Sequence, residues 1–404
     1  MSNRAKWIIT LFIIIDIIVV VLLIATRYSF IFAPDDDDKN ASGQNSAFSK
    51  IPADWPMFRG EPALRGIASG KLPDSLEMKW KYKTDGPIRS SAAVKSGRVY
   101  IGSDDENVYC LNLANGKKVW SFQTEDAVEA APCILDGMVF VGSADSFLYA
   151  LDAETGDLKW KYEAEAQILG AANWERSPEG DSAWILAGSY DNKLHCVDSV
   201  TGKMVWVYET DNYINGAPAV ADGKVVFGGC DAILHVVSIA DGKEIIGIET
   251  DAYIAGSPAL DGEYIYAGNY GGEFIAADIN TGDILWSYMG DGSPFFSSPA
   301  VGEKQVIFGA RDEQLHCIDR RNGKPLWTFK AQDNVDSSPV ICGDKVVVGS
   351  DDGRLYMVKL SDGKEIWSYE IGEAIIGSPA VVGGMVIIGS EDGYVYAFGP
   401  VTND

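Results

Sequence analysis

A repeat of about 40 residues dominates the sequence. A tryptophan recurs after a turn at Trp80, Trp120, Trp160, Trp206, Trp286, Trp327 and Trp367, and Ile246 takes this place once. The successive steps are 40, 40, 46, 40, 40, 41 and 40 residues, and the six extra residues fall in a polar stretch, 175–182. A unit of this length buries only part of a sheet face, so it needs neighbours like itself.

Each unit contains three or four short β-strands. In the stretch from Gly349 to Tyr369, two Gly-containing turns separate alternating segments, which is the signal for consecutive hairpins. A period near 40 with about four strands per unit is typical of propeller blades. The sequence therefore predicts an all-β fold, an eight-bladed β-propeller of four-stranded blades.

The two ends of the repeat region complement each other. The segment Lys79–Lys83 reads as an outermost strand without its own blade, and the chain stops soon after the third strand of the last unit, Tyr394–Phe398. We expect the Trp80 strand to complete the eighth blade. Closure of the ring in this way removes open sheet edges.

The N-terminal region reads as a membrane anchor. Residues 7–26 form an apolar run long enough to span a bilayer, interrupted only by Asp16, and no small-residue cleavage site follows it. We expect a cytoplasmic tail (1–6), a transmembrane signal anchor (7–26), a polar linker (27–53) and the propeller (54–400). A cleaved signal peptide is the alternative. Asp16 either contacts another membrane helix or is tolerated in a single anchor.

Charge agrees with this division. The span and its flanks carry a net +2, so the whole-chain charge of −25 leaves −27 on the rest. Positive residues before the span favour a cytoplasmic N-terminus and an exported propeller, on the extracytoplasmic side of the cytoplasmic (inner) membrane. A body this acidic repels nucleic acid, so we expect none as a partner.

The repeat also resembles a known family. The segment LDAETGDLKW (residues 151–160), its relatives in the other units and the opening DWPMFRG (54–60) are similar to the quinoprotein-type repeat. That family includes pyrroloquinoline-quinone (PQQ) dehydrogenases and the outer-membrane assembly factor BamB. The resemblance implies that the tryptophans dock between blades. It covers nearly the whole exported part, but a fold does not determine a function.

Three histidines invite a catalytic or metal-binding interpretation. His195, His235 and His316 occupy one repeat position, which tyrosine holds in other units. They lie in separate units and cannot converge, so we expect packing residues of the third strand. The Asp-rich turns, such as 351–353, lack the spacing of a calcium loop and fit turn chemistry instead. We predict no catalytic residue and no metal site.

The cysteines give no catalytic signal either. Three of them, Cys110, Cys196 and Cys317, share a position that small residues hold elsewhere, which favours buried free thiols; the other three lie at Cys133, Cys230 and Cys342. Disulfides from Cys110 to Cys133 and from Cys317 to Cys342 are the alternative in an exported domain. The chain lacks the vicinal cysteine pair of many quinone-dependent alcohol dehydrogenases, and we expect no cofactor, PQQ included.

Binding residues are predicted where the repeat varies. The residue that precedes each small-residue triplet of the innermost strand changes from unit to unit: Arg89, Glu129, Leu169, Asn215, Ala255, Phe296, Asp336 and Ile376. The preceding loops add Tyr213, Tyr253 and Phe295. Clustered aromatics on loops suit the binding of a protein. The alternatives are that these aromatics fill the channel mouth against each other, and that Arg89 and Glu129 only form a salt bridge.

These observations predict a membrane-anchored, extracytoplasmic binding scaffold without catalytic activity. The resemblance to BamB implies protein partners of the cell envelope and a part in envelope protein assembly. A PQQ-dependent dehydrogenase and a sensor or small-ligand-binding ectodomain are the alternatives.

Overall fold

The computed structural model describes residues 54–178, 180 and 182–401. The chain divides into two units, Met1–Ser49 and Lys50–Asp404. The predicted tail, membrane anchor and linker lie outside the described residues. Within the described part of the chain, no helix has the length and apolar character needed to cross a membrane.

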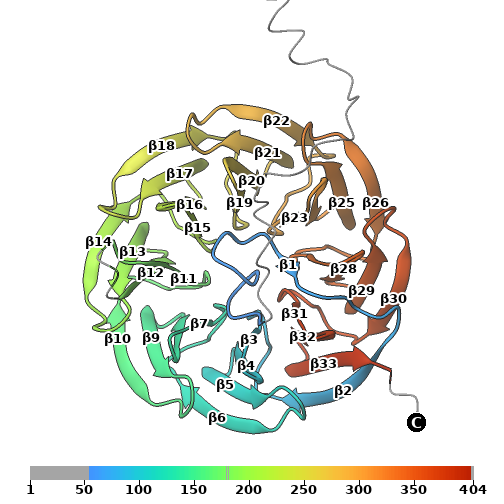
Figure 1. Cartoon of the computed structure of the whole chain (residues 1–404), viewed down its shortest axis with the longest axis horizontal. Helices are drawn as coiled ribbons and strands as arrows, with labels where there is room; N and C mark the ends of the chain where they lie inside the picture. Colours follow the sequence, from blue (N-terminus) through green and yellow to red (C-terminus); the bar gives the residue numbers. More distant parts are fainter. Residues whose placement is uncertain (1–53, 179, 181, 402–404) are drawn as a thin grey trace, which may run out of the picture. The chain divides into compact units, whose positions relative to one another are not determined.

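The second unit is a ring of eight four-stranded antiparallel sheets, as predicted (Figure 1). The first four blades contain β3 (Ala93–Lys95), β4 (Arg98–Gly102), β5 (Asn107–Asn112) and β6 (Lys118–Gln123); β7 (Cys133–Leu135), β8 (Met138–Gly142), β9 (Phe147–Asp152) and β10 (Leu158–Glu163); β11 (Asn173–Arg176), β12 (Ala183–Gly188), β13 (Lys193–Asp198) and β14 (Met204–Glu209); β15 (Ala219–Ala221), β16 (Lys224–Gly228), β17 (Ile233–Ser238) and β18 (Glu244–Glu249).

The other four blades follow the same plan. They contain β19 (Ala259–Asp261), β20 (Tyr264–Gly268), β21 (Glu273–Asp278) and β22 (Ile284–Met289); β23 (Ala300–Val301), β24 (Gln305–Gly309), β25 (Gln314–Asp319) and β26 (Pro325–Lys330); β27 (Val340–Cys342), β28 (Lys345–Gly349), β29 (Arg354–Lys359) and β30 (Glu365–Glu370); β31 (Ala380–Val382), β32 (Met385–Gly389), β33 (Tyr394–Pro400) and β2 (Leu76–Lys83).

Strand β2 closes the ring. It pairs antiparallel with β33, and Trp80 lies opposite Ala397, so the first repeat strand of the chain completes the last blade. This confirms the predicted closure. The two strands lie side by side in Figure 1, where the blue and red ends of the chain meet. All eight blades therefore have their four strands.

The repeated tryptophans join neighbouring blades. Trp120 in β6 donates its indole N–H to the carbonyl of Ala153 in the next blade (3.1 Å), and its ring covers Gly156. The same bond is made by Trp80, Trp160, Trp206, Trp286 and Trp327. The glycine is needed because it has a positive φ and a Cβ would lie 2.8 Å from the indole ring.

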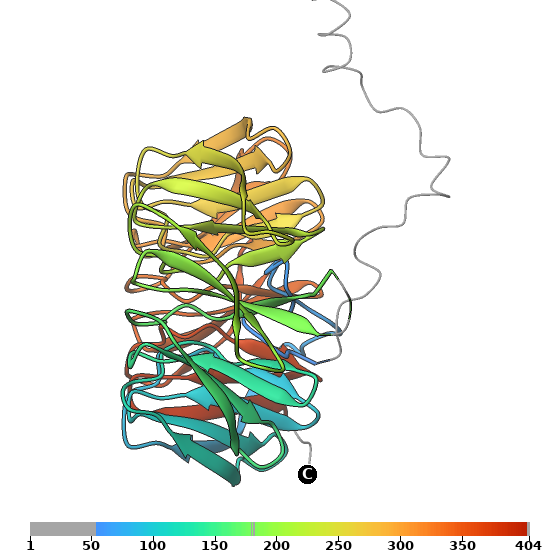
Figure 2. The same cartoon turned by 90° about the vertical axis from the view of Figure 1, so that its left-hand side faces the viewer.

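One segment lies outside the repeat. Residues 54–75 cross the centre of the ring and lie at one of its faces (Figures 1 and 2). Part of it, β1 (Ile67–Ala68), pairs parallel with β27 as a fifth strand. We call residues 54–68 the clasp. Its backbone bonds to innermost-strand residues of seven blades, namely Val94, Ile134, Asn173, Val220, Leu260, Val301 and Ile341. The repeat pattern did not predict this role.

Charged side chains anchor the clasp. Arg65 is buried and pairs with Glu61 and with Asp261, the last residue of β19, at 3.1 Å. Asp261 also pairs with Arg320 of the next blade. Arg59 is fully buried and donates to the Pro299 carbonyl (2.9 Å), and burial lowers its pKa to about 9. These contacts tie the clasp to the inner strands of blades 5 and 6.

The tryptophan contact predicts an effect of adding a single methyl group. Gly156 and Gly137 lie in the same blade with similar φ values, +79° and +78°, but only Gly156 faces an indole. Gly137→Ala should cost about 1–2 kcal/mol for the left-handed backbone alone. Gly156→Ala should cost about 1–3 kcal/mol more, because the added Cβ displaces Trp120. Urea unfolding of both variants measures the difference, and equal losses would contradict the packing role of Trp120.

The buried ion network predicts a large effect at Asp261. Asp261→Asn removes the shared partner of two arginines, and the loss of one member of a buried pair costs about 3–5 kcal/mol. The matched control is Glu303→Gln. Glu303 lies on the face of the ring that carries the clasp, and its side chain is exposed. That control should change the free energy of unfolding by less than about 0.5 kcal/mol. A similar small effect at Asp261 would show that the network does not hold the clasp.

Candidate functional site

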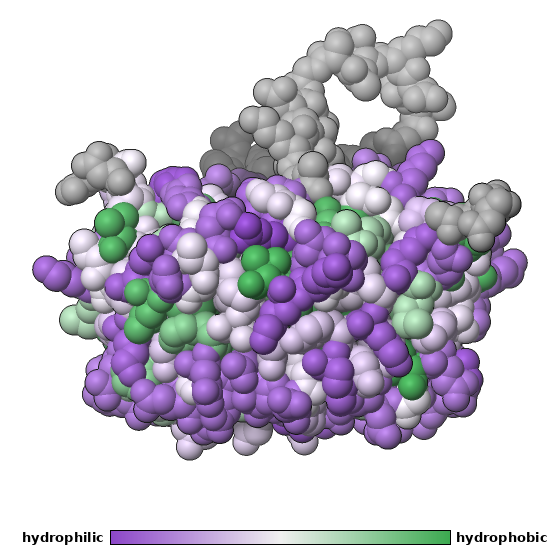
Figure 3. All heavy atoms as spheres, turned by 90° about the horizontal axis from the view of Figure 1, so that it is seen from below, coloured by the Kyte–Doolittle hydropathy of each residue, from purple (hydrophilic) through white to green (hydrophobic). Residues whose placement is uncertain are grey.

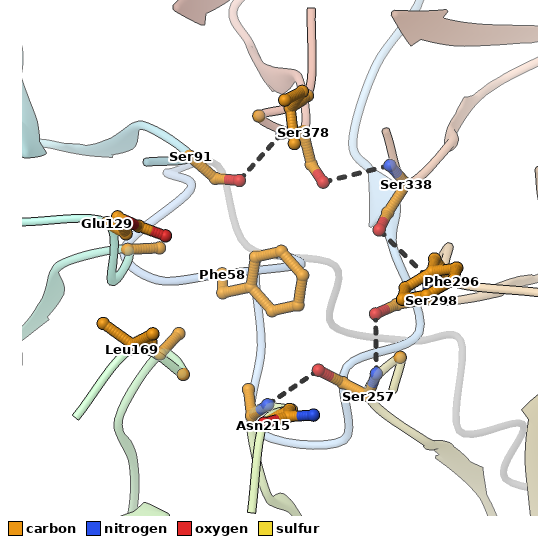
Figure 4. A pocket seen from close by; sticks show the side chains of 18 of the residues that line it. Phe58, Ser91, Glu129, Leu169, Asn215, Ser257, Phe296, Ser298, Ser338 and Ser378 are labelled. Atoms are coloured by element: carbon orange, nitrogen blue, oxygen red, sulfur yellow. Dashed lines mark hydrogen bonds between the residues drawn. The ribbon is translucent and has the colours of Figure 1, made fainter. Parts of the chain in front are cut away.

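The eight variable positions encircle one cavity. All of them, from Arg89 in blade 1 to Ile376 in blade 8, line a cavity of about 190 Å³ in the central channel. Figure 4 shows Glu129, Leu169, Asn215 and Phe296 arranged around its centre. Their predicted place beside the channel is therefore confirmed. They lie at the face opposite the clasp, which we call the channel mouth.

The wall of the cavity has a hydroxyl side and a methyl side. Five serines from consecutive blades each accept a backbone N–H from the preceding blade: Ser257, Ser298, Ser338, Ser378 and Ser91, at 2.8–3.1 Å. The chain of bonds is visible in Figure 4. At the matching position the other three blades carry Ala131, Ala171 and Ala217. The wall is thus polar over five blades and apolar over three.

The floor of the cavity is an aromatic ring. Phe58 belongs to the clasp and lies at the centre of the channel, where it is partly exposed to the cavity (Figure 4). The channel is therefore closed on the clasp side and open at the mouth. Sequence reasoning missed this residue because it occurs once and belongs to no repeat; the only signal was an aromatic residue in the DWPMFRG opening.

The rim of the cavity is acidic. Arg89 pairs with Asp104 (2.9 Å), Glu391 (3.0 Å) and, more weakly, Glu129 (3.8 Å). The predicted alternative of an Arg89–Glu129 salt bridge is thus present, although Glu129 is the most distant of the three partners. Across the rim, Arg311 pairs with Asp336 at 2.7 Å.

With Asp351, which interacts with Asp336, the described part of the rim holds five carboxylates and two arginines. Its formal charge is therefore −3.

Several carboxyl groups of the rim have raised pKa values. Burial and the neighbouring Asp336 raise the pKa of Asp351 to about 6. Burial raises the pKa of Asp104 and of Glu129 as well; Glu391 raises the pKa of Asp104 further, and Asp104 raises that of Glu129. A raised pKa means that the ionised group is less stable in the folded protein than in water. The rim therefore has more negative charge than its own arginines neutralise.

An arc of aromatic rings runs along one side of the mouth, over blades 3 to 6. Tyr190 stacks on Tyr213 with ring centroids 5.1 Å apart, and Tyr253 meets Tyr270 at 6.0 Å. Phe296 continues the arc, 5.5 Å from Tyr270 and beneath the Arg311 guanidinium at 3.8 Å. About half of the surface of Tyr213, Tyr253 and Tyr270 is exposed.

Two interpretations of these aromatics follow from the sequence: they bind a partner, or they fill the channel mouth against each other. The rings contact each other, as one alternative predicted, but they also present exposed surface. Phe295 is a correction: it is buried in the core with Phe308 and His316, so it is not available to a partner. The conformation of the loop between β22 and β23 explains this, since it turns Phe295 into the core and leaves Phe296 beside the cavity.

Other apolar residues are scattered. On the side wall seen in Figure 3, hydrophobic residues form separate spots among hydrophilic ones, which is usual for a soluble surface. A second cavity of about 500 Å³ lies between the clasp and blades 1 to 3, lined by Met57, Ile134 and Trp174 among others. It holds none of the variable positions.

The histidines occupy the predicted packing position. Each lies buried in a third strand, and each ring bridges an Asp of its own blade and a Tyr of the preceding blade. In blade 3, His195 Nε2 lies 3.0 Å from Asp191, and Nδ1 lies 3.0 Å from the Tyr162 hydroxyl. Among the described residues, no group of three or more His, Cys, Asp or Glu side chains could hold a metal ion.

The cysteines are free thiols. Five are buried, and Cys230 is partly exposed at the mouth, where its Sγ accepts from the Asn215 amide (3.2 Å). The disulfides considered from the sequence, from Cys110 to Cys133 and from Cys317 to Cys342, are therefore not formed. Burial raises the pKa of Cys110 and Cys133 to about 12, so these thiols stay protonated.

The raised pKa of Asp351 predicts a pH-dependent gain in stability on its neutralisation. The folded state holds this proton more tightly than the unfolded chain, so the carboxyl favours folding near pH 4 and loses that contribution as pH rises toward 6. Asp351→Asn should therefore raise the melting temperature at pH 7, and the gain should vanish near pH 4. The exposed Asp222→Asn is the control, and an equal shift there would refute the account.

Solved structures show the same architecture. BamB from Moraxella catarrhalis is 22% identical, covers 82% of this chain and 99% of its own, and has a TM-score of 0.68. Quinohemoprotein alcohol dehydrogenase from Comamonas testosteroni is 14% identical, with coverage of 89% and 83% and a TM-score of 0.71. A europium-containing methanol dehydrogenase is 13% identical, with coverage of 86% and 98% and a TM-score of 0.72. At these identities the likeness shows the fold alone.

No curated protein matches the chain. The family model described as outer membrane protein assembly factor BamB matches residues 74–177, 169–245 and 249–403, which is most of the sequence and all eight blades. The recognised resemblance is thereby confirmed. The chain belongs to the family of the outer membrane protein assembly factor BamB.

Proposed function

We propose that this protein is a membrane-anchored extracytoplasmic scaffold that binds a protein partner of the cell envelope at the channel mouth. The observation that carries the proposal is the exposed aromatic arc, which three pairs of contacting rings build on loops of four consecutive blades. Rigid aromatic side chains on a fixed scaffold are the residues that dominate binding energy at protein interfaces. The family supports a part in envelope protein assembly.

The anchor and the location are part of this proposal. The apolar run at residues 7–26 is long enough to cross a membrane, and a linker follows it. A propeller held by such an anchor stays at the cytoplasmic membrane on its extracytoplasmic side. The net charge of −25 keeps the scaffold away from anionic lipid surfaces and nucleic acid. Its partner is therefore more readily another protein of the same compartment.

PQQ does not fit the channel mouth. The cofactor is a flat polycarboxylic acid, so its site must supply positive charge and donors. Here the rim has a formal charge of −3, and both arginines, Arg89 and Arg311, already pair with carboxylates. The cavity of about 190 Å³ is also smaller than the ~300–1,000 Å³ of pockets for drug-sized ligands. We therefore favour the scaffold over a PQQ-dependent dehydrogenase.

The proposal predicts crosslinks from the arc. A photoreactive phenylalanine analogue placed at Tyr213 or at Tyr253 in cells should give the same discrete adduct, with a protein of the cell envelope. The matched control is Tyr264, which is exposed to a similar degree but lies beside a hairpin of the clasp face. Mass spectrometry identifies the adduct. A cytoplasmic protein, or equal adducts from Tyr264, would contradict the proposal.

Substitution tests the energetics of the same contact. With the crosslinked partner purified, Tyr253→Ala should weaken binding by about 2 kcal/mol, or roughly 30-fold, as truncation of an interface tyrosine does. Tyr264→Ala should leave affinity unchanged. Titration calorimetry of the full-length protein in a non-ionic detergent measures both. Equal affinity of the unsubstituted protein and both variants for the partner would place the interface elsewhere.

A further inference from the structure

We propose that the channel cavity binds the side chain of a single lysine or arginine residue that the protein partner carries. The inference rests on the proposed function, because it names the feature of the partner that the mouth selects. The cavity lies at the centre of the mouth, and the aromatic arc runs along one side of it. Phe296 belongs to both, since it ends the arc and lines the cavity, so a partner segment on the arc lies within reach of the cavity opening.

Charge at the opening favours a cation. Glu129 lines the cavity directly, and its closest approach to the rim arginine is long, 3.8 Å. Asp336, which also pairs with Arg311, lines the wall three blades away and interacts with Asp351. A positively charged side chain that enters between these groups gains Coulomb attraction in a partly dehydrated site, where it is stronger than in water. An acidic side chain would be repelled.

Hydrogen bonding points the same way. Among the described residues, six buried side-chain polar atoms have no hydrogen-bond partner: Nε and Nη1 of Arg59 in the clasp, and Oδ1 of Asp104, Asn192, Asn215 and Asp351. Of the four residues with an unpaired oxygen, Asn215 lines the cavity. An oxygen acceptor without a donor is costly when buried. Lysine and arginine side chains carry donors only, so they complement such a site, whereas a carboxylate carries acceptors only.

The floor and the wall suit the same side chain. The Phe58 ring closes the cavity from below, and the face of an aromatic ring attracts an ammonium or guanidinium group. The Arg59 guanidinium of the clasp already lies 6.0 Å from the centroid of this ring, so the ligand would be a second cation near it. The apolar wall of Ala131, Leu169 and Ala217 suits the methylene stem of a long basic side chain. On the other wall, each serine Oγ accepts one backbone N–H and retains a lone pair.

Size limits the ligand to one side chain. The cavity volume of about 190 Å³ holds a long side chain and leaves no room for a cofactor or a helix. The clasp closes the other end of the channel, so the ligand enters and leaves through the mouth. A basic residue on an extended segment or a loop of the partner meets these conditions.

Short peptides test the inference directly. The probes are Ac-(4-fluoro-Phe)-Gly-Lys-Gly-(4-fluoro-Phe)-NH2 and the same peptide with Gln in place of Lys, titrated against the full-length protein in a non-ionic detergent and followed by fluorine NMR. The aromatic ends address the arc, and the central residue addresses the cavity. We expect the Lys peptide to bind about tenfold more tightly than the Gln peptide, the gain of a partly buried charge interaction.

Matched variants assign the difference to the cavity. Glu129→Gln with Asp336→Asn should bring the Lys peptide to the affinity of the Gln peptide. The control pair, Asp222→Asn with Glu303→Gln, removes the same charge from the clasp face, where both side chains are exposed, and should leave the difference intact. Phe58→Leu keeps an apolar floor and should cost the Lys peptide about threefold while sparing the Gln peptide.

The outcomes separate the two proposals. Equal binding of both peptides, with loss of both on Tyr253→Ala, would overturn the cation site and leave the arc as the docking surface. Loss of the Lys preference in the control pair would show attraction to the overall negative charge and would also overturn the site. Binding that neither Tyr253→Ala nor the rim variants affect would overturn both proposals.

Discussion

Packing between neighbouring blades is the interaction on which this protein depends. A four-stranded sheet of about 40 residues covers neither of its faces alone, so each blade is stable only between two others. The tryptophan of the outermost strand makes this dependence specific, because its N–H reaches a carbonyl of the next blade while its ring lies on a glycine there. Where Ile246 replaces tryptophan, the ring contact with Gly282 becomes a methyl contact and the indole bond is lost.

The repeat made most of the fold predictable. Positions that recur at every step, such as the tryptophans and the strand-ending glycines, report a demand that all blades share. The number of blades, the strand order and the closure by β2 follow from them. The eight variable positions around the cavity were also predictable. A position that varies inside a regular repeat is free of the packing requirement that all blades share.

What occurs once was not predictable. Phe58 and the clasp have no counterpart in the repeat, and the bonds of the clasp to seven blades follow from the finished channel alone. The sequence did not show which of Phe295 and Phe296 is buried, because the directions of their side chains depend on the conformation of the β22–β23 loop. The bond of each buried histidine to a tyrosine of the preceding blade likewise depends on how two blades meet, as for His195 and Tyr162.

The clasp also constrains the order in which the molecule can assemble. The clasp precedes all eight blades in the chain, yet its hydrogen-bond partners lie on strands as far along the sequence as β27. Strand β2 likewise can pair only when β33, the last strand, is present. Contacts between such distant residues form slowly and late in folding. A chain emerging from a ribosome or an export channel must therefore hold these early residues unpaired until nearly the last strand arrives. During that interval a chaperone would find the first strands exposed, and the finished disc would hide them.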